Sequence, residues 1–282
     1  MCIPFLTQDT SIRNAVRLAF EELPLLLWSC LVTKPFLPHI SSNGNTSHLP
    51  DEAGPEYRYM DHLKSMLVDL GSHCGPKTLH LLNASVNYLE VGHWMKSWGF
   101  HTSKRVRKRR ELFDQIAERV RNKKVLYLEF GVAKGTSMRY WSNLLANPVT
   151  ILHGFDTFEG LPEEWRLGDL KGAYSAGGRL PEIADPRVRF FKGLFQETLP
   201  HYQLPDHERL IVNIDCDLYS STCFVLNFLA PHICPGTYLY FDEFSDPRHE
   251  LRAFRELLAA TNKRFSLLGA TRSYGQVAFE CI

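Results

Sequence analysis

The sequence lacks the paired cysteines of a zinc knuckle or a thiol redox motif. Its seven cysteines lie at positions 2, 30, 74, 216, 223, 234 and 281, and no two of them form a Cys-x-x-Cys pair. This scattered pattern favours reduced cysteines and a cytoplasmic location. Neither sign of charge is in excess, because 32 basic and 31 acidic side chains leave a net charge of +1. We therefore expect neither nucleic acid nor a membrane as the partner.

Long hydrophobic runs are missing as well. The apolar run over residues 23–32 contains Pro24 and falls short of the roughly 20 residues that a transmembrane helix needs. It also lacks the basic start and the small-residue cleavage site of a signal peptide. With 282 residues and 44% hydrophobic side chains, the chain is long enough for one sizeable α/β domain with additional elements.

Two common phosphate-binding motifs are absent from residues 125–137, the stretch around which the chain is organised. A P-loop needs Gly-Lys-Ser/Thr, whereas here Lys134 precedes Gly135. A dinucleotide fingerprint needs Gly-x-Gly-x-x-Gly, whereas positions 133 and 136 hold Ala and Thr. What the stretch contains is an apolar run, then Glu129, then Gly131 and Gly135, and then Thr136 and Ser137 at a helix start. This order predicts a buried parallel strand, a glycine turn and a helix around a small anionic or nucleoside ligand.

The C-terminal part alternates predicted strands with predicted helices. We expect strands over residues 125–130, 150–155, 188–191, 210–214, 237–241, 265–268 and 276–281. Helices are expected over residues 136–146, after a Ser220–Thr222 cap cluster, and from Asp246 and Pro247 onward. This alternation predicts an α/β, Rossmann-like, mostly parallel seven-stranded sheet with helices on both faces.

Asp156 follows the second predicted strand. At this place an acidic residue can accept hydrogen bonds from a ribose diol, and a helix-cap or turn carboxylate is the alternative. Asp156 lies twenty-five residues after Gly131, which suits one helical crossover. The sequence thus favours a nucleoside ligand at the glycine turn.

Three regions lie outside this alternation. Residues 1–100 predict an N-terminal helical extension, with helices within 1–34, over 57–70 and after Pro76, and a loop or linker near 35–56. Residues 101–282 form the predicted catalytic domain, in which the long loop over 160–186 is read as a lid or a substrate-facing loop. The basic run over 104–110 is either a phosphate or nucleic-acid patch or a solvated helix start. We favour the helix start, because no aromatic residues interleave with the charges.

Acidic side chains follow two later strands. Asp215 and Asp217 are two residues apart and therefore point the same way, and Asp242 and Glu243 leave the end of the next strand. If these strands are neighbours, four carboxylates converge beside the glycine turn and repel one another. A hard divalent cation such as Mg²⁺ would resolve this repulsion. The alternative is that each acid caps a helix or pairs with Arg or Lys.

The ordered motifs resemble those of the macrocin O-methyltransferase group of class I S-adenosylmethionine (SAM) methyltransferases. The resemblance covers roughly residues 110–280 and rests on five segments, at 128–137, 154–165, 192–200, 214–222 and 241–244. Members of this group include Mg²⁺-dependent enzymes that methylate sugar hydroxyls of natural products. Better-studied members carry Asp-Asp where this chain has Asp242 and Glu243.

The resemblance implies roles for individual residues. Glu129, Gly131, Gly135, Thr136 and Ser137 would line the methionine side of SAM, Asp156 would bind its ribose with Thr157 and Phe158 beside it, and Gly193 and Phe195 would lie near the adenine. Asp215 would border the cofactor and, with Asp242 and Glu243, match the metal positions, and Asp217 matches the proposed catalytic base. A metal that holds the acceptor oxygen lowers its pKa, and a nearby carboxylate can take the proton.

The sequence therefore predicts a SAM-dependent O-methyltransferase, Mg²⁺-assisted, that acts on a hydroxyl of a small metabolite such as a natural-product sugar. A metal-independent SAM methyltransferase with Asp217 or His249 as base is the first alternative. A non-catalytic SAM-binding partner protein is the second, and a nucleic-acid methyltransferase that uses residues 104–110 is the third. The methyl acceptor and the formation of a homo-oligomer are left open.

Overall fold

The computed structural model describes residues 55–102 and 105–282. The helices predicted within 1–34 and nearly all of the linker near 35–56 lie outside the described residues. The next two predicted helices are confirmed as α3 (Pro55–Ser72) and α4 (Pro76–Ser97). No helix in the described part of the chain is both long and apolar enough to cross a membrane.

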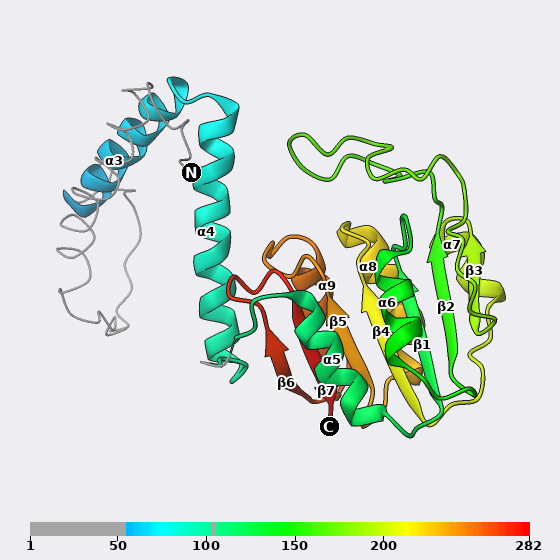
Figure 1. Ribbon diagram of the computed structural model, residues 1–282. Helices are drawn as coiled ribbons and strands as arrows, with labels where there is room; N and C mark the ends of the chain where they lie inside the picture. The colour runs from blue at the N-terminus through cyan, green and yellow to red at the C-terminus, as the bar shows by residue number, and fades with distance from the viewer. Residues whose placement is uncertain (1–54, 103–104) are drawn as a thin grey trace, which may run out of the picture. The chain divides into compact units, whose positions relative to one another are not determined.

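One seven-stranded sheet organises the C-terminal part (Figure 1). Its strands are β1 (Val125–Phe130), β2 (Ile151–Asp156), β3 (Val188–Lys192), β4 (Arg209–Ile214), β5 (Tyr238–Phe241), β6 (Phe265–Ala270) and β7 (Val277–Cys281). They lie in the order β3-β2-β1-β4-β5-β7-β6, and all neighbours are parallel except β7, which runs antiparallel to β5 and β6. The predicted Rossmann-like class I methyltransferase fold is confirmed, with an antiparallel edge.

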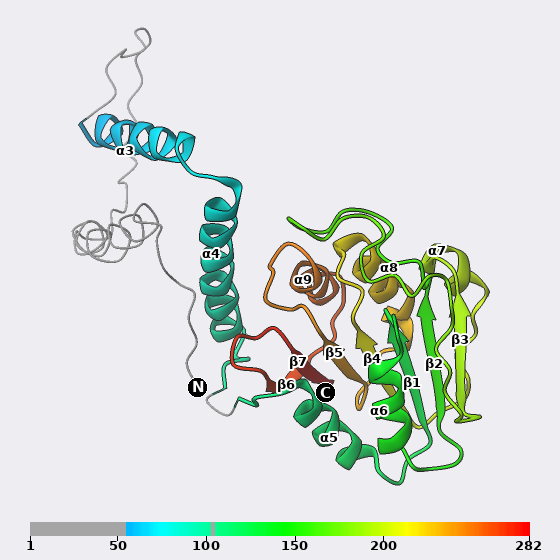
Figure 2. The ribbon, with the colours of Figure 1, turned by 45° about the horizontal axis from the view of Figure 1, so that its top comes forward.

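Helices cover both faces of this sheet. They are α5 (Arg109–Val120), α6 (Thr136–Leu144), α7 (Phe195–Thr198), α8 (Tyr219–Leu229) and α9 (Glu250–Ala260), with short 3₁₀ turns η1 (Leu199–His201) and η2 (Ala230–His232). Figures 1 and 2 show α5 and α6 on one face and α8 and α9 on the other. The last turns of α4 join the second face, where Trp94 packs against Phe244 and Phe254.

The strand sequences explain this double coverage. All six residues of β1 are buried, as expected for a central strand of a parallel sheet. Tyr127 packs with Phe113 of α5 and Trp141 of α6, whereas Leu126 and Leu128 belong to the core under α8 and α9. Successive side chains thus alternate between the two faces. The apolar run over residues 125–130, which has no alternation with polar residues, correctly predicted a strand buried on both faces.

Two helix starts differ from the prediction. Leu218 occupies the N-cap position of α8, so Ser220 and Thr222 lie inside the helix, where Thr222 Oγ1 donates to the Leu218 carbonyl. Helix α9 begins only at Glu250, because Asp246 accepts hydrogen bonds from Arg248 in a turn of its own. In both cases a short polar side chain forms a local hydrogen bond instead of capping the helix: Thr222 donates to a carbonyl, and Asp246 accepts from Arg248.

Candidate active site

A cavity of about 970 Å³ lies at the carboxyl ends of the parallel strands. In this fold class the crevice at that edge is where ligands bind. The cavity is lined by most of the predicted site residues, namely Glu129, Gly131, Thr136, Ser137, Asp156, Thr157, Gly193, Phe195, Asp215, Asp217, Asp242 and Glu243. The sheet thus brings together side chains from the ends of β1, β2, β3, β4 and β5.

Two predicted cofactor residues lie outside the cavity lining. Phe158 is buried and packs edge-on against Phe190 of β3. Gly135 is the N-cap of α6, and a side chain there would meet Pro181. Both residues shape the turns around the cavity, and their predicted contact with a cofactor stays a prediction.

The glycine turn brings β1 very close to the neighbouring strand end. Gly131 has φ +90°, and a Cβ atom there would lie 1.8 Å from the backbone oxygen of Asp215. Only glycine meets both conditions, because L-residues rarely adopt this φ and no side chain fits the space. The turn therefore lies directly against Asp215, the first residue after β4.

Asp156 is a turn carboxylate, the alternative that the sequence left open beside the ribose contact. Its Oδ2 atom accepts hydrogen bonds from the backbone N–H groups of Val132 and Ala133, each at 2.7 Å, and Oδ1 accepts one from Phe158 at 2.7 Å. The carboxylate thereby fixes the glycine turn from the end of β2. It also lines the cavity, so a contact with a ribose hydroxyl through its remaining lone pairs stays a prediction.

Glu129 faces the cavity from a buried strand. The Tyr127 hydroxyl donates to its Oε2 at 2.6 Å, and Asn213 Nδ2 donates to the Tyr127 oxygen at 2.9 Å. Burial raises the pKa of Glu129 to about 8, against the lowering effect of Tyr127 and of the Arg109 charge. A carboxyl in such a site gains most from a ligand that carries a positive charge.

The four predicted carboxylates at the ends of β4 and β5 do converge. Asp215, Asp217, Asp242 and Glu243 all line the same cavity. Asp217 adopts φ +61°, a left-handed conformation that is uncommon for a non-glycine residue. Burial, followed by the charge of Glu243, raises the pKa of Asp217 to about 7. Asp217 is thus a carboxylate close to half-protonation at neutral pH, which suits a proton acceptor.

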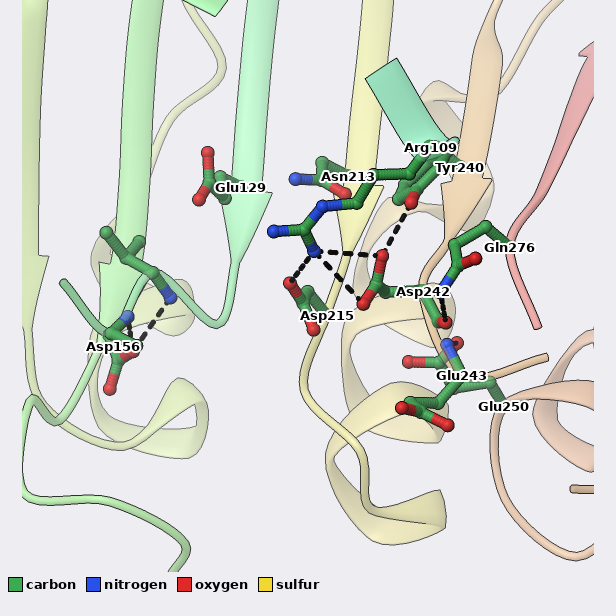
Figure 3. A network of polar contacts seen from close by, with 12 residues as sticks. Arg109, Glu129, Asp156, Asn213, Asp215, Tyr240, Asp242, Glu243, Glu250 and Gln276 are labelled. Carbon is green, nitrogen blue, oxygen red and sulfur yellow. Dashed lines mark hydrogen bonds and ion pairs between the residues drawn. The ribbon is translucent and has the colours of Figure 1, made fainter. Parts of the chain in front are cut away.

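Two guanidinium groups hold the remaining carboxylates, and Figure 3 shows the first of them, that of Arg109. Arg109 Nη1 donates to both oxygens of Asp242 at 3.2 Å and lies 3.8 Å from Asp215 Oδ2. Arg166 Nη1 lies 3.6 Å from Glu243 Oε2. Within the described ranges, no three His, Cys, Asp or Glu side chains are grouped so that they could hold a metal ion. The carboxylates as arranged fit cationic side chains, and they do not fit the predicted Mg²⁺.

Arg109 is the site residue that the sequence analysis missed. It belongs to the basic run over 104–110, which we interpreted as a solvated helix start. Arg110 agrees with that interpretation, since its guanidinium lies over the Tyr140 ring at the outer side of α5. Arg109, the first residue of α5, instead lines the cavity. The available signal was the alternative that the converging acids pair with Arg or Lys, which did not say which basic residue is the partner.

The loop predicted to be a lid forms part of the cavity wall. Residues 160–163, Trp165 and residues 173–175 line the cavity, and Leu161 and Trp165 pack with Leu218. The loop folds back on itself through backbone hydrogen bonds between Leu161 and Ala173 and between Gly172 and Leu161. In Figure 1 it is the green segment that projects from the end of β2 and returns to β3. The loop lies beside Leu218, the neighbour of Asp217, and this position agrees with a substrate-facing loop. That role stays a prediction.

Comparison with known proteins places this site in a family context. Residues 179–263 match the family model described as Macrocin-O-methyltransferase (TylF). The resemblance to this group that the motifs predicted is confirmed by this match. The matched range includes Asp215, Asp217, Asp242 and Glu243, and it excludes the glycine turn and Arg109.

Two curated relatives from Streptomyces match a similar share of the chain. The chain is 31% identical over 107 residues to 8-demethyl-8-(2,3-dimethoxy-alpha-L-rhamnosyl)-tetracenomycin-C 4'-O-methyltransferase of Streptomyces olivaceus. It is 30% identical over 106 residues to demethyldecarbamoylnovobiocin O-methyltransferase of Streptomyces niveus. Each match covers 32% of this chain and spans 40% of the length of the relative.

Solved methyltransferase structures resemble the chain at lower identity. The calicheamicin methyltransferase CalS11 matches with 21% identity and a TM-score of 0.48 over 85% of this chain and 99% of that chain. The O-methyltransferase NovP matches with 23% identity and a TM-score of 0.46 over 60% of this chain and 78% of that chain.

Proposed function

We propose that this chain is a SAM-dependent O-methyltransferase that methylates a hydroxyl group of a small natural-product metabolite. One observation carries the proposal. The glycine turn after β1 and the carboxylates Glu129 and Asp217 open into a single cavity of about 970 Å³. A cofactor held at the turn and an acceptor held at Asp217 would therefore meet in one cavity, as transfer between two bound reactants requires.

The chain's own residues fit the parts of SAM. Glu129 suits the ammonium group of the methionine part, because an adjacent positive charge favours the ionised form of a buried carboxyl. Gly131 lets the turn pass directly against the Asp215 backbone at the cavity wall, and the α6 N-terminus begins directly after the turn. Asp156 is in place for a ribose hydroxyl, and Gly193 and Phe195 border the cavity on the side of β3. When bound, SAM supplies an electrophilic methyl group on a sulfonium.

The chemical step needs a proton acceptor beside the acceptor hydroxyl. We assign this role to Asp217, whose pKa of about 7 balances ionisation at neutral pH against basicity. As the new O–CH₃ bond forms and the S–CH₃ bond breaks, the hydroxyl proton passes to the Asp217 carboxylate. SAM would supply the methyl group from its sulfonium and would leave with the bonding electron pair as a neutral thioether. The Glu243 carboxylate is paired with Arg166, and this pairing keeps Glu243 from taking part in the proton transfer.

The acceptor is proposed from the names of the relatives together with the cavity. One relative is named for methylation of a rhamnosyl tetracenomycin and the other for a demethyldecarbamoylnovobiocin. We therefore propose a sugar hydroxyl on a natural product as the acceptor class. Trp165 lies in the cavity wall with the Arg166 guanidinium 3.6 Å from its ring centroid, so this wall presents an aromatic and a cationic side chain to the proposed acceptor. The cytoplasmic location predicted from the scattered cysteines stays a prediction.

Calorimetric titration of the full-length protein with SAM tests the cofactor. Asp156→Ala and Glu129→Gln should weaken binding, and Asp206→Asn, an exposed surface residue, should not. Turnover is then measured as S-adenosylhomocysteine release with a panel of glycosylated natural products. Absence of SAM binding by the wild type would overturn the proposal. SAM binding without turnover on any hydroxylated acceptor would favour a non-catalytic SAM-binding protein.

A further inference from the structure

Arg109 reaches across the sheet edge to two carboxylates that come from different strands. Its Nη1 atom donates to Asp242 Oδ1 and Oδ2, each at 3.2 Å, and lies 3.8 Å from Asp215 Oδ2. The Arg109 side chain is 38% exposed and lines the cavity, so it belongs to the wall of the site. Figure 3 shows the guanidinium beside Asp215 and Asp242, at the ends of β4 and β5.

The surroundings of Asp242 hold this contact in one geometry. The Tyr240 hydroxyl donates to Asp242 Oδ1 at 2.5 Å, and Gln276 Nε2 donates to the Asp242 backbone oxygen at 3.1 Å. Asp242 is buried, with an exposed fraction of 8%. A buried carboxylate with a fixed donor on one oxygen and a held backbone is a strong partner for a planar guanidinium.

The electrostatics of helix α5 does not explain why a cationic side chain occupies position 109. Arg109 is the first residue of α5 and follows Lys108 at the N-cap. The positive end of the helix dipole disfavours cations there. The favourable term that offsets this cost is the pairing with Asp215 and Asp242. The position of Arg109 is thus explained by the site and not by the helix.

The same contacts occupy the place at which a divalent cation would bind. Mg²⁺ needs carboxylate oxygens at about 2.1 Å, so an ion on Asp242 would lie within about 5 Å of the Arg109 guanidinium nitrogen. Three positive charges at that distance in a partly buried site repel strongly. Glu243, the third predicted ligand, is paired with Arg166, which in turn donates to Asp169 at 2.7 Å.

We propose that Arg109 is the internal cation of the acceptor site and takes the place of a divalent metal ion in this chain. The catalytic role of Arg109 in this inference rests on the proposed function. The expectation that the site binds no metal ion rests on the geometry alone. Arg109 offsets one of the two negative charges that Asp215 and Asp242 would place beside the acceptor. The Arg109 Nε and Nη2 groups form no hydrogen bond with the described residues, so they are available to donate to the acceptor oxygen. Methyl transfer by this chain then needs no added metal.

Binding of Mn²⁺, measured by the loss of its free-ion electron paramagnetic resonance signal, tests this proposal without any turnover. Chelator-treated full-length wild type should bind no Mn²⁺ up to about 1 mM. Arg109→Ala should bind at least about tenfold more tightly, because the competing charge is gone and the carboxylates remain. Arg109→Lys should behave like the wild type. Tight binding by the wild type that Asp242→Asn abolishes would overturn the proposal.

Matched variants separate this effect from general changes in charge. Arg110→Ala removes a neighbouring guanidinium that lies over Tyr140, and it should leave Mn²⁺ binding unchanged. The double variant Arg109→Ala/Asp242→Asn should lose the binding that Arg109→Ala gains. Unfolding curves check that each variant is folded. If Arg109→Ala fails to fold, Arg109→Gln and the wild-type titration still decide the outcome.

SAM titration in the same samples keeps the two proposals apart. Failure of SAM to bind the wild type would overturn the proposed function and leave the Mn²⁺ result standing. If SAM binds and turnover is found, chelator should not reduce the wild-type rate. A wild-type rate that chelator abolishes and Mg²⁺ restores would overturn the role of Arg109 as the internal cation.

Discussion

The Tyr127 hydroxyl donates a hydrogen bond to Glu129 Oε2 at 2.6 Å, between two residues that share one face of β1. Both side chains are buried, and Asn213 on the adjacent β4 donates to the Tyr127 oxygen at 2.9 Å. A residue of the sheet core thus positions a residue of the cavity wall. The pair links the packing under α6 to the charge that faces the proposed cofactor.

Removal of this hydroxyl should weaken cofactor binding. Burial raises the pKa of Glu129, and the Tyr127 hydrogen bond lowers it, so Tyr127→Phe should raise that pKa further. Less of the carboxylate is then ionised at neutral pH, and SAM affinity should fall by about tenfold. Calorimetry at pH 7.5 measures this. Tyr238→Phe, which removes a hydroxyl bonded to Glu280 outside the cavity, serves as the control and should bind SAM normally. Equal affinities for wild type and Tyr127→Phe would contradict the role of the pair.

Gly131→Ala should destabilise the whole domain. The new Cβ atom would lie 1.8 Å from the Asp215 backbone oxygen, and φ +90° is strained for alanine. We expect a loss of at least about 3 kcal/mol in the free energy of unfolding, measured by urea titration. Gly168→Ala is the control for backbone strain, since Gly168 has φ +99° but nothing within 4 Å of an added Cβ. The difference between the two variants gives the cost of the steric clash. That control should cost only about 1 kcal/mol. Similar losses in both variants would show that backbone strain, and not the close approach, dominates.

Most of the fold could be predicted from the sequence because the strand signals were strong. The apolar run at 125–130 coincides with β1, and the other six strands fall within two residues of their predicted ends. The order of the strands in the sheet was not predicted, since periodicity alone does not state which strands are neighbours. The predicted helix starts at α8 and α9 were wrong by a few residues, because Thr222 donates to a carbonyl inside the helix and Asp246 accepts from Arg248 in a separate turn.

The site was predicted only in part, for a physical reason. Carboxylates that follow neighbouring strands must converge, so Asp215 and Asp242 could be placed together before the structure was known. The cation that meets them comes from α5, more than a hundred residues away in the sequence. No local pattern separates Arg109 from Arg110, since the side of the helix that each covers is decided by tertiary packing. Long-range pairing of charges is therefore the part that sequence patterns do not reveal.

His153 should make the fold sensitive to acid. It is buried on β2 beside Tyr202, with Nδ1 2.8 Å from the Tyr202 oxygen, and burial followed by the Arg189 charge lowers its pKa to about 4. The unfolded chain, with an ordinary histidine pKa near 6.5, binds more protons between these values, so stability should fall as pH drops from about 6.5 to 4. After allowance for solvent screening we expect about 2 kcal/mol. Urea unfolding at pH 7 and pH 4.5 measures the loss, which His153→Gln should reduce. An unchanged loss in His153→Gln would assign the acid sensitivity to other groups.

Asp217→Asn should separate chemistry from binding. Asparagine has the same shape and is among the residues that tolerate the left-handed φ of +61°, so the variant should fold. It cannot accept the hydroxyl proton, and turnover should drop by about 10²- to 10⁴-fold while SAM affinity stays within a factor of about two. His249→Gln tests the alternative base, since His249 Nδ1 is buried with no hydrogen-bond partner among the described residues and its ring contacts Trp165. Retained turnover in Asp217→Asn together with loss in His249→Gln would transfer the role of base to His249.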